Sequence, residues 1–267
     1  MKILILSPHR DDAAFSLSIA ITNWLAAGHR VTILNVFTRS LHAPYSDADF
    51  VHENDRLSYV SAMRHREDEL FLQRITHDLP KAAKTHLQFL DLKLKDAPIR
   101  LRCAVEDLYD TPVNPEDPAI EKIRKALTRE SESGNLEALI VPLALGHHVD
   151  HLTALAAALP FTVALPSAFY EDLPYAATHP SVATDLQTLR EDVTQRLHEP
   201  LTPVLSQHPQ AAELKRHLAL GYASQIEEET ANLIANFATR YNGGERLWVN
   251  QSWQAIAEAN HLTTAQP

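Results

Sequence analysis

The chain has 267 residues and a formal net charge of −10, with 24 Lys and Arg against 34 Asp and Glu. This length is sufficient for a hydrophobic core without disulfides, and the single cysteine, Cys103, excludes an intrachain disulfide or a cysteine-based zinc finger. The negative charge disfavours binding to nucleic acid or to an anionic membrane. No apolar run approaches the roughly 20 residues of a membrane span, and the run at residues 3–6 is too short for a signal peptide, so we expect a cytoplasmic protein.

The predicted elements begin with a strand, a helix and a second strand. Residues 2–6 (KILIL) form an apolar run typical of a strand buried on both faces. Apolar residues recur at helical spacing from Asp11 or Asp12, and Gly28 stands where a helix C-terminal cap is expected. Residues 30–37 (RVTILNVF) are rich in β-branched side chains and complete a βαβ unit.

Strands and helices continue to alternate along the chain. Helices are predicted at 51–75, at 116–130, from Val149 or Asp150, and at 180–198; strands at 86–92, 136–142 and 161–170; and a long helix or helix pair at 209–237. This alternation predicts an α/β fold with a Rossmann-like, doubly wound, mostly parallel sheet, helices on both faces and a C-terminal helical or mixed extension packed on it. No linker rich in Gly, Ser or Pro divides the chain, so we expect a single domain over 1–267.

Two polar turns follow predicted strands. Residues 8–12 (PHRDD) come after the first strand, and residues 146–151 (GHHVDH) come after the strand at 136–142. Ligands of open α/β sheets bind beyond the carboxyl ends of the strands, where such turns lie. The two turns can therefore converge at one edge of the sheet although they are far apart in the sequence.

Together the turns supply the ligand chemistry of zinc or another divalent ion. His9, Asp12 and His151 could fill three protein positions and leave a fourth open for water, with Asp11 free to accept a proton from that water. An alternative set pairs His147 with His151, which are four residues apart and can share a helix face. A simpler interpretation is that the two aspartates only cap a helix and the histidines are solvated. The coincidence of both turns at one predicted edge favours the metal site.

The two turns resemble the P-H-x-D-D and H-x-D-H motifs of the PIG-L or LmbE-like zinc de-N-acetylases. Further segments that resemble this family lie at residues 64–68, 90–91, 169–176, 215 and 222–225, so the resemblance covers most of the chain. The most familiar form of the first motif is P-H-P-D-D-E, and here Arg10 replaces the proline and Ala13 the glutamate. That form resembles a bacterial branch of the family.

The resemblance implies a Rossmann-like fold that holds zinc through His9, Asp12 and His151, with Fe²⁺ or another divalent ion as an alternative. It implies that Asp11 is the general base. It also implies that His148 stabilises the oxyanion or protonates the leaving amine, with Asp150 orienting a histidine.

Four further residues are candidate substrate contacts. Arg10 would lie beside the pocket, where its guanidinium could hold a phosphate or carboxylate. Arg66 resembles a substrate contact of the family, and the alternative is a surface ion pair with Glu69. Tyr170 and Glu171 lie at a predicted strand end, where they and the neighbouring Asp172 line the pocket or turn the chain. The loop at 41–49 is a candidate rim of the pocket, whereas residues 222–225 are expected mainly to pack.

The resulting hypothesis is hydrolysis of the N-acetyl group of an amino sugar or glycoconjugate. The expected partner is a small-molecule substrate, with no nucleic acid and no integral membrane segment; the sequence does not specify the oligomeric state. The alternatives are a zinc amidase acting on a non-sugar N-acyl compound or thiol conjugate, and a catalytically silent metal-binding protein.

Overall fold

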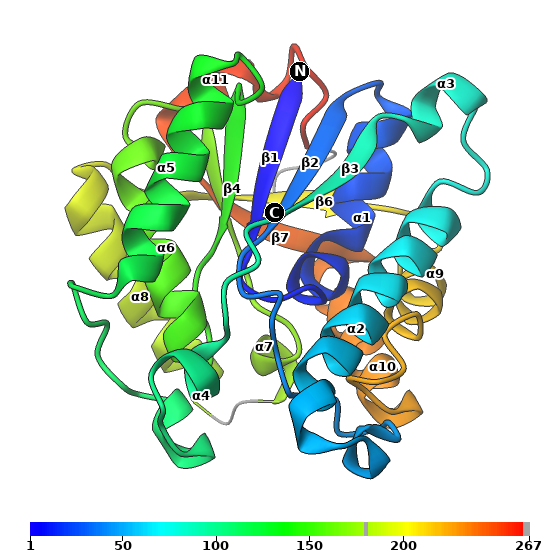
Figure 1. Cartoon of the computed structure of the whole chain (residues 1–267). Helices are drawn as coiled ribbons and strands as arrows, with labels where there is room; N and C mark the ends of the chain where they lie inside the picture. The colour runs from blue at the N-terminus through cyan, green and yellow to red at the C-terminus, as the bar shows by residue number, and fades with distance from the viewer. Residues whose placement is uncertain (179–180, 264–267) are drawn as a thin grey trace.

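A computed structural model of the protein describes residues 1–178 and 181–263 and shows a seven-stranded sheet (Figure 1). The strands are β1 (Lys2–Ser7), β2 (Arg30–Asn35), β3 (Leu87–Asp91), β4 (Ala138–Pro142), β5 (Ser167–Tyr170), β6 (Thr202–Gln207) and β7 (Gly244–Val249). Their order across the sheet is β3-β2-β1-β4-β5-β7-β6. The first five are parallel, and β7 is antiparallel to both of its neighbours.

Helices cover both faces of this sheet (Figure 1). They are α1 (Asp12–Ala26), α2 (Glu53–Ile75), α3 (Lys81–Lys84), α4 (Ala97–Arg100), α5 (Pro118–Glu132), α6 (Val149–Thr162), α7 (Tyr175–Thr178), α8 (Val182–Leu197), α9 (Ala211–Ala219), α10 (Glu228–Phe237) and α11 (Gln251–Ala257). On one face, α1 packs with α2 and α9; on the other, α6 packs with α5 and α8. This is the predicted α/β fold with a mostly parallel sheet, and the prediction is confirmed.

The reversal of strand order places a crevice beyond β1 and β4. The chain proceeds from β1 outward through β2 to β3, and then returns to pair β4 with the other side of β1. Because the two halves of the sheet are wound in opposite directions, the loops after β1 and β4 separate at their carboxyl ends, which is where ligands of such sheets bind. These ends lie at the bottom of Figure 1, near α4 and α7.

The sheet interior explains the apolar strand sequences. The β4 residues are all buried, and so are Ile3 to Leu6 of β1, because helices cover both faces of these central strands. The main hydrophobic cluster contains side chains from Ile3 to Leu262, so the C-terminal part of the chain shares this core. Gly28 has φ +84° directly after α1, the left-handed conformation expected of a helix cap.

One predicted boundary is wrong. The strand predicted at 161–170 begins only at Ser167, because α6 continues through Pro160 to Thr162. A β-branched or aromatic run such as FTV favours a strand locally, but here its first two residues complete the last turn of a helix packed on β4. Residues 209–237 form a helix pair, α9 and α10. Pro180 of the helix predicted at 180–198 lies outside the described residues.

The C-terminal extension is more than a layer on the sheet, because it contributes β6 and β7 to it. Neither strand was predicted. Pro203 lies within β6, where it lacks an amide hydrogen, and β6 is the edge strand of the sheet, where proline is tolerated. Polar and charged residues in β7, such as Glu245 and Arg246, weaken its apolar pattern.

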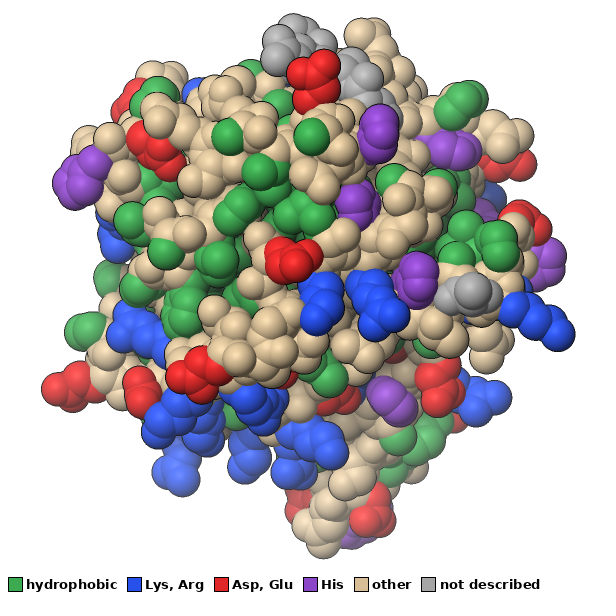
Figure 2. Space-filling model, turned by 90° about the horizontal axis from the view of Figure 1, so that it is seen from above, with side chains coloured by type: hydrophobic (Ala, Val, Ile, Leu, Met, Phe, Trp, Pro, Cys, Tyr) green, Lys and Arg blue, Asp and Glu red, His purple; other side chains and the backbone are tan. Residues whose placement is uncertain are grey.

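Two further observations concern the surface of the molecule. Within residues 1–178 and 181–263, no helix combines the length and the apolar character needed to cross a membrane. Seen from above, Lys and Arg side chains gather toward the lower part of the view, with Asp and Glu side chains beside them (Figure 2). The charges of this acidic chain are therefore unevenly distributed over its surface.

Candidate metal centre and active site

The two polar turns meet beyond the carboxyl ends of β1 and β4. Residues 8–11 lead directly into α1, and residues 143–148 lead into α6. Gly146 has φ +83° and lies against Tyr175 so closely that a Cβ atom would approach the Tyr175 ring to 2.6 Å. The second turn is therefore compact, and it directs the first residues of α6 toward the loop after β1.

His9, Asp12 and His151 form a group of side chains that could hold a metal ion. One ligand atom of each lies within 4.8 Å of the others. The Asp12 Oδ2 atom is 3.4 Å from His9 Nδ1 and 3.3 Å from His151 Nε2. His151 is fully buried, and its Nε2 atom has no hydrogen-bond partner among the described residues. Two imidazoles and a carboxylate, with one buried ring nitrogen that makes no hydrogen bond among the described residues, fit the donor set of a divalent zinc-like ion.

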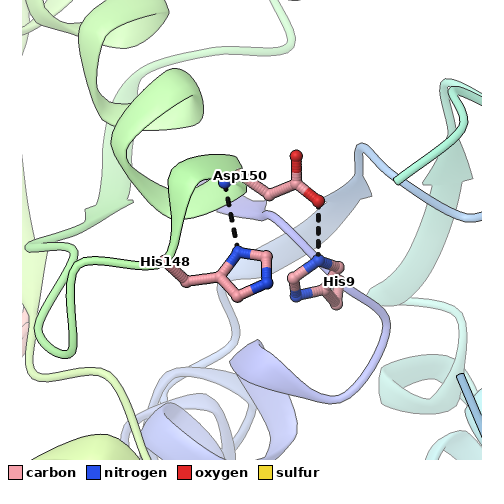
Figure 3. Close-up of side chains that lie close together, drawn as sticks. All are labelled: His9, His148 and Asp150. Carbon is pink, nitrogen blue, oxygen red and sulfur yellow. Dashed lines mark hydrogen bonds and ion pairs between the residues drawn. The ribbon is translucent and has the colours of Figure 1, made fainter. Parts of the chain in front are cut away.

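A second group, which shares His9, consists of His9, His148 and Asp150 (Figure 3). The His9 Nε2 atom lies 3.1 Å from Asp150 Oδ2, and the His148 Nδ1 atom accepts a hydrogen bond of 3.1 Å from the Asp150 amide. The second bond makes His148 the N-cap of α6 and fixes the orientation of its ring.

Partners outside the cavity hold these ligands in place. Asp172 Oδ1 lies 2.6 Å from His151 Nδ1, and the other Asp172 oxygen accepts a hydrogen bond from the Leu145 amide. Asp150 Oδ2 also accepts a hydrogen bond from the Ala97 amide, while its Oδ1 atom forms an ion pair of 2.7 Å with Arg100. Each imidazole is therefore oriented through its second nitrogen, as is usual for histidines that bind metals.

The carboxylates make the site favourable for positive charge. Burial opposes a charged imidazole, but Asp12 and Asp150 outweigh it and raise the pKa of His9 to about 10. Nearby carboxylates likewise outweigh burial and raise the pKa of His151. Burial opposes a charged carboxyl, but His151 and His9 hold the pKa of Asp12 well below its usual range. A divalent cation between these side chains would supply the positive charge that bound protons otherwise provide.

His148 differs from the other two histidines. Burial, together with the neighbouring His9 and His151, lowers the pKa of His148 to about 3. Because its Nδ1 atom accepts a hydrogen bond from the Asp150 amide, a neutral ring carries its proton on Nε2, an assignment that follows from the hydrogen bond. His148 can therefore donate a hydrogen bond from Nε2.

A cavity of about 310 Å³ opens beside the candidate ligands. His9, Asp11, Asp12 and His148 line its polar side. Its remaining wall is largely apolar and includes the side chains of Phe15, Pro98, Val105, Leu108, Tyr109, Pro174, Tyr175 and Ile226. Asp11 lies in this cavity and accepts a hydrogen bond of 2.9 Å from Arg64. A carboxylate free of the candidate metal group thus faces the same space as that group.

The two arginines predicted to contact substrate do not line this cavity. The Arg10 guanidinium is almost fully buried and binds Asp68 and Asp91, the latter at 2.5 Å. Arg66 is exposed and lies with Glu69 in a separate surface hollow. The arginine of α2 that reaches the cavity is Arg64. Both arginines belong to the segment 64–68, and the sequence did not define which face of the helix points inward.

Tyr170 and Glu171 also do not line the cavity. Tyr170 is buried in the sheet, where its hydroxyl donates a hydrogen bond to the Leu6 carbonyl. Glu171 is buried against the C-terminal strands and accepts hydrogen bonds from Tyr241, Arg246 and Trp248. Tyr170 therefore connects β5 to β1 inside the sheet. Glu171 connects the end of β5 to the C-terminal part of the chain.

The sequence analysis missed several residues of the site. Tyr175 belongs to the segment 169–176, whose resemblance to the family was noted, and Asp172 was considered there only as a residue that lines the pocket or turns the chain, not as a partner of His151. Arg100 and Tyr109 had no such signal, because they lie between β3 and α5 in a stretch without periodicity. Arg100 reaches the site only through its ion pair with Asp150.

Fold and site together define an α/β protein with a candidate metal centre at the carboxyl end of its parallel strands. A curated relative, 2'-N-acetylparomamine deacetylase from Streptomyces fradiae, is 29% identical over 203 residues. The alignment covers 71% of this chain and 63% of that protein, so it spans less than two thirds of the relative's length. No family model matches the chain.

Solved structures share the fold over most of the chain. The zinc-inhibited form of teicoplanin deacetylase has a TM-score of 0.66 at 20% identity, covering 93% of this chain and 97% of that one. N,N'-diacetylchitobiose deacetylase from Pyrococcus horikoshii has a TM-score of 0.56 at 15% identity, covering 94% and 84%. The 4-carboxy-2-hydroxymuconate hydratase GalB from Pseudomonas putida has a TM-score of 0.56 at 12% identity, covering 93% and 96%. Because a hydratase shares the fold, the function must be argued from the site.

Proposed function

We propose that this protein is a metal-dependent de-N-acetylase that acts on an amino sugar or glycoconjugate. The observation that carries the proposal is the convergence of His9, Asp12 and His151, with ligand atoms within 4.8 Å of one another, beside a cavity that His9, Asp12 and Asp11 line. We further propose zinc as the ion, since two imidazoles, one carboxylate and an open position are typical of catalytic zinc. The similarity to 2'-N-acetylparomamine deacetylase supports the reaction and the substrate class.

In this proposal Asp11 is the general base. When bound, the ion held by His9, Asp12 and His151 would supply Lewis acidity, which makes a neighbouring water more acidic and so easier to deprotonate. Asp11 lies beside the candidate ligands without belonging to their group, and it accepts a hydrogen bond from Arg64 through one oxygen. Its other oxygen is then available to accept a proton from the attacking water.

His148 stabilises the oxyanion in this proposal. Its ring lines the cavity, and its Nε2 atom is the donor when Nδ1 accepts a hydrogen bond from the Asp150 amide. A donor fixed in this way contributes on the order of 3 kcal/mol to stabilising a developing negative charge. Asp150 would orient His9 through the contact with its Nε2 atom, and Asp172 would orient His151.

We also propose that the chain is a member of the PIG-L or LmbE-like zinc de-N-acetylases. The motifs at residues 8–12 and 148–151 support this assignment, and so does the arrangement of their side chains around one cavity. The proposal does not carry over the substrate of any one relative. A panel of N-acetylated sugars, including N-acetylglucosamine, N,N'-diacetylchitobiose and acetylated aminoglycosides, would define the substrate by release of free amine.

The decisive variant is Asp11→Asn. We expect it to bind zinc as the unchanged chain does, by elemental analysis, because Asp11 lies outside the ligand group. We expect its kcat to fall at least about 100-fold, because the proton acceptor is lost. Asp78→Asn, an exposed aspartate far from the cavity lining, is the matched control and should leave kcat unchanged. An active Asp11→Asn enzyme would remove the assigned base, and zinc-loaded protein that hydrolyses no amide would favour a silent metal-binding protein.

A further inference from the structure

Two groups of side chains that could hold an ion overlap at His9. We call His9, Asp12 and His151 the first donor group, and His9, His148 and Asp150 the second. The His9 Nδ1 atom lies 3.4 Å from Asp12, whereas its Nε2 atom lies 3.1 Å from Asp150. A neutral imidazole has one N–H and one nitrogen lone pair, so it can offer that lone pair on only one of these sides. The contacts of the other members therefore decide which group holds the ion.

Both oxygens of Asp150 are already engaged. The side chain is fully buried, and its Oδ2 atom accepts a hydrogen bond of 2.9 Å from the Ala97 amide beside the contact with His9. Its Oδ1 atom forms an ion pair of 2.7 Å with the Arg100 Nη1 atom. In Figure 3 the Asp150 oxygen that does not contact His9 points away from both imidazole rings. Arg100 thus neutralises Asp150 from the side opposite the histidines.

The Arg100 guanidinium is itself held in one position. Its Nε atom donates a hydrogen bond of 2.9 Å to Asp117 at the start of α5, and its Nη1 atom donates one of 3.1 Å to the Lys95 carbonyl. The guanidinium carbon lies 4.3 Å from the centre of the Phe37 ring. Arg100 does not line the cavity, and its side chain is only 11% exposed. A planar cation held at its edge and on its face fixes the carboxylate that it binds.

We propose that Arg100 is a positioning residue that prevents Asp150 from binding the ion, so that the first donor group holds it. Paired with Arg100, the Asp150 carboxylate accepts the Nε2 hydrogen of His9, and the lone pair of His9 Nδ1 faces Asp12. Without Arg100, a fully buried carboxylate would lack its cation, and binding the ion together with His148 would supply one. This inference rests on the metal centre of the proposed function and names a residue that selects its ligands.

The affinity for Zn²⁺ with and without His148 tests this selection, because His148 belongs only to the second donor group. Competition with a chromogenic chelator measures the Kd of the full chain. Asn at position 148 keeps an acceptor that can cap α6, and His148→Asn alone should change Kd less than about twofold. In the Arg100→Gln background, the same change should weaken binding about tenfold, since the first donor group remains as an alternative. His151→Asn in the otherwise unchanged chain should weaken binding more than about 100-fold, because loss of an outer partner already costs about 10–100-fold.

The visible absorption of the protein with Co²⁺ in place of Zn²⁺ is a second readout, because it depends on the kind and geometry of the ligands. We expect Arg100→Gln to change this spectrum. Arg100→Lys, which keeps a cation at this position, should retain the spectrum of the unchanged chain. The matched control is Arg129→Gln, which changes an arginine with a side chain that is 69% exposed, and it should also retain the spectrum. A lower Tm in Arg100→Gln with an unchanged spectrum would show a purely structural role and overturn the inference.

The pattern over the variants decides the outcome. Dependence of Kd on His148 in Arg100→Gln, without it in Arg100→Lys and Arg129→Gln, supports the inference. Equal dependence in Arg100→Gln and Arg100→Lys, dependence already in the unchanged chain, or dependence in none of them overturns it. If Arg100→Gln does not fold, Phe37→Leu removes the ring against the guanidinium and should make Kd depend on His148 about threefold. No dependence in that variant would then overturn the inference.

Metal binding separates this inference from the proposed function, since neither measurement needs turnover. If no amide is hydrolysed but Kd depends on His148 in Arg100→Gln alone, the deacetylase proposal fails and the role of Arg100 stands. If deacetylation is observed while Kd is independent of His148 in every variant, only the inference about Arg100 fails. A Kd that is unchanged in His151→Asn would overturn the proposed metal centre and the inference with it.

Discussion

The position of a residue around the axis of α2 decides whether its side chain faces the cavity. Successive residues of an α-helix are rotated by about 100°, so residues two apart point to nearly opposite sides. Arg64 is buried, lines the cavity and binds Asp11, whereas Arg66 is exposed and lies beside Glu69. A pattern of charged residues such as RHRED identifies the helix but does not say which arginine faces inward, because both are polar.

The two arginines give a matched pair of variants. If the proposed reaction is correct, Arg64→Ala should lower kcat/KM about tenfold or more, because Asp11 loses the donor that orients it. Arg66→Ala should change kcat/KM by less than about twofold, since Arg66 contacts no cavity residue. Steady-state kinetics on one substrate measures both. Equal losses in the two variants would contradict the assignment of Arg64.

A residue far from the cavity predicts a dependence of stability on pH. His29 is buried, and its Nε2 atom lies 2.7 Å from the Asn260 carbonyl. Burial lowers the pKa of His29 below its usual value of 6.5, and the hydrogen bond to Asn260 does not cancel this effect. The unfolded chain therefore binds a proton more readily than the folded chain, so the contribution of His29 to stability is present above pH 6.5 and is lost as the pH falls below it.

The measurement is the difference in Tm between pH 7.5 and pH 5.5. We expect this difference to be larger in the unchanged chain than in His29→Gln, because only the former gains a proton at this position on unfolding. The comparison of two slopes cancels the other titrating groups, including the histidines of the site. Identical slopes in the two proteins would show that the pKa of His29 does not change on folding.

At the scale of residues, the sequence predicted the candidate site residues that lie close together in the chain, next to the end of a strand. His9, Asp11 and Asp12 are contiguous with one strand end, and His148, Asp150 and His151 with another, so the topology of an α/β sheet brings them together. Arg100 and Tyr109 reach the site from a connection whose path no periodicity defines. Arg10 was misassigned for a different reason: its charge is satisfied by Asp68 and Asp91, which come from other elements and cannot be identified as partners from sequence.

At the scale of elements, a buried ion pair from the C-terminal part of the chain contacts the backbone of α1. In a regular helix the Ile19 amide would donate to the Phe15 carbonyl. Here Lys215 of α9 donates a hydrogen bond of 2.7 Å to the Phe15 carbonyl, and Glu245 of β7 accepts from the amides of Ile19 and Ala20. Lys215 and Glu245 also bind each other. Two residues from the C-terminal part of the chain therefore bond to the backbone of the helix that begins at Asp12.

Removing one partner of this pair should be costly. Lys215→Ala leaves the Glu245 carboxylate buried without its cation, and we expect the free energy of unfolding to fall by about 3–5 kcal/mol. Arg196→Ala breaks an exposed pair with Asp192 within α8 and should cost less than about 1 kcal/mol. Urea denaturation of both variants measures the difference. Losses of similar size would contradict the structural role assigned to Lys215.

The strands that the sequence predicted best are those whose residue pattern depends only on burial of the strand in the core. β1 and β4 are buried on both faces, and their apolar runs are unambiguous. β6 and β7 were not predicted, because their residues serve other partners: Glu245 binds α1, Arg246 binds Glu171, and Pro203 occupies an edge. Their pairing is determined by contacts with distant elements, and a local pattern contains little information about it.

At the scale of the whole molecule, metal binding should raise stability, because α1 and α6 both contribute candidate ligands. Zinc at 100 times its dissociation constant should add about 2.7 kcal/mol, which corresponds to an increase in Tm of about 5–10 °C for a chain of this size. His151→Asn should largely abolish this increase, and His77→Asn, an exposed histidine, should not. Differential scanning calorimetry with and without a chelator measures it. A zinc-dependent increase in His151→Asn equal to that of the unchanged chain would place the ion elsewhere.

The contact of Glu245 with α1 has a consequence for biosynthesis. A ribosome makes the PHRDD segment early, yet Lys215 and Glu245, which bond to the helix that follows it, are made only after some 200 further residues. A nascent chain therefore carries two of the three candidate ligands, His9 and Asp12, before α1 can reach its full set of contacts. The surroundings of the candidate centre are therefore completed only after β7 has been synthesised.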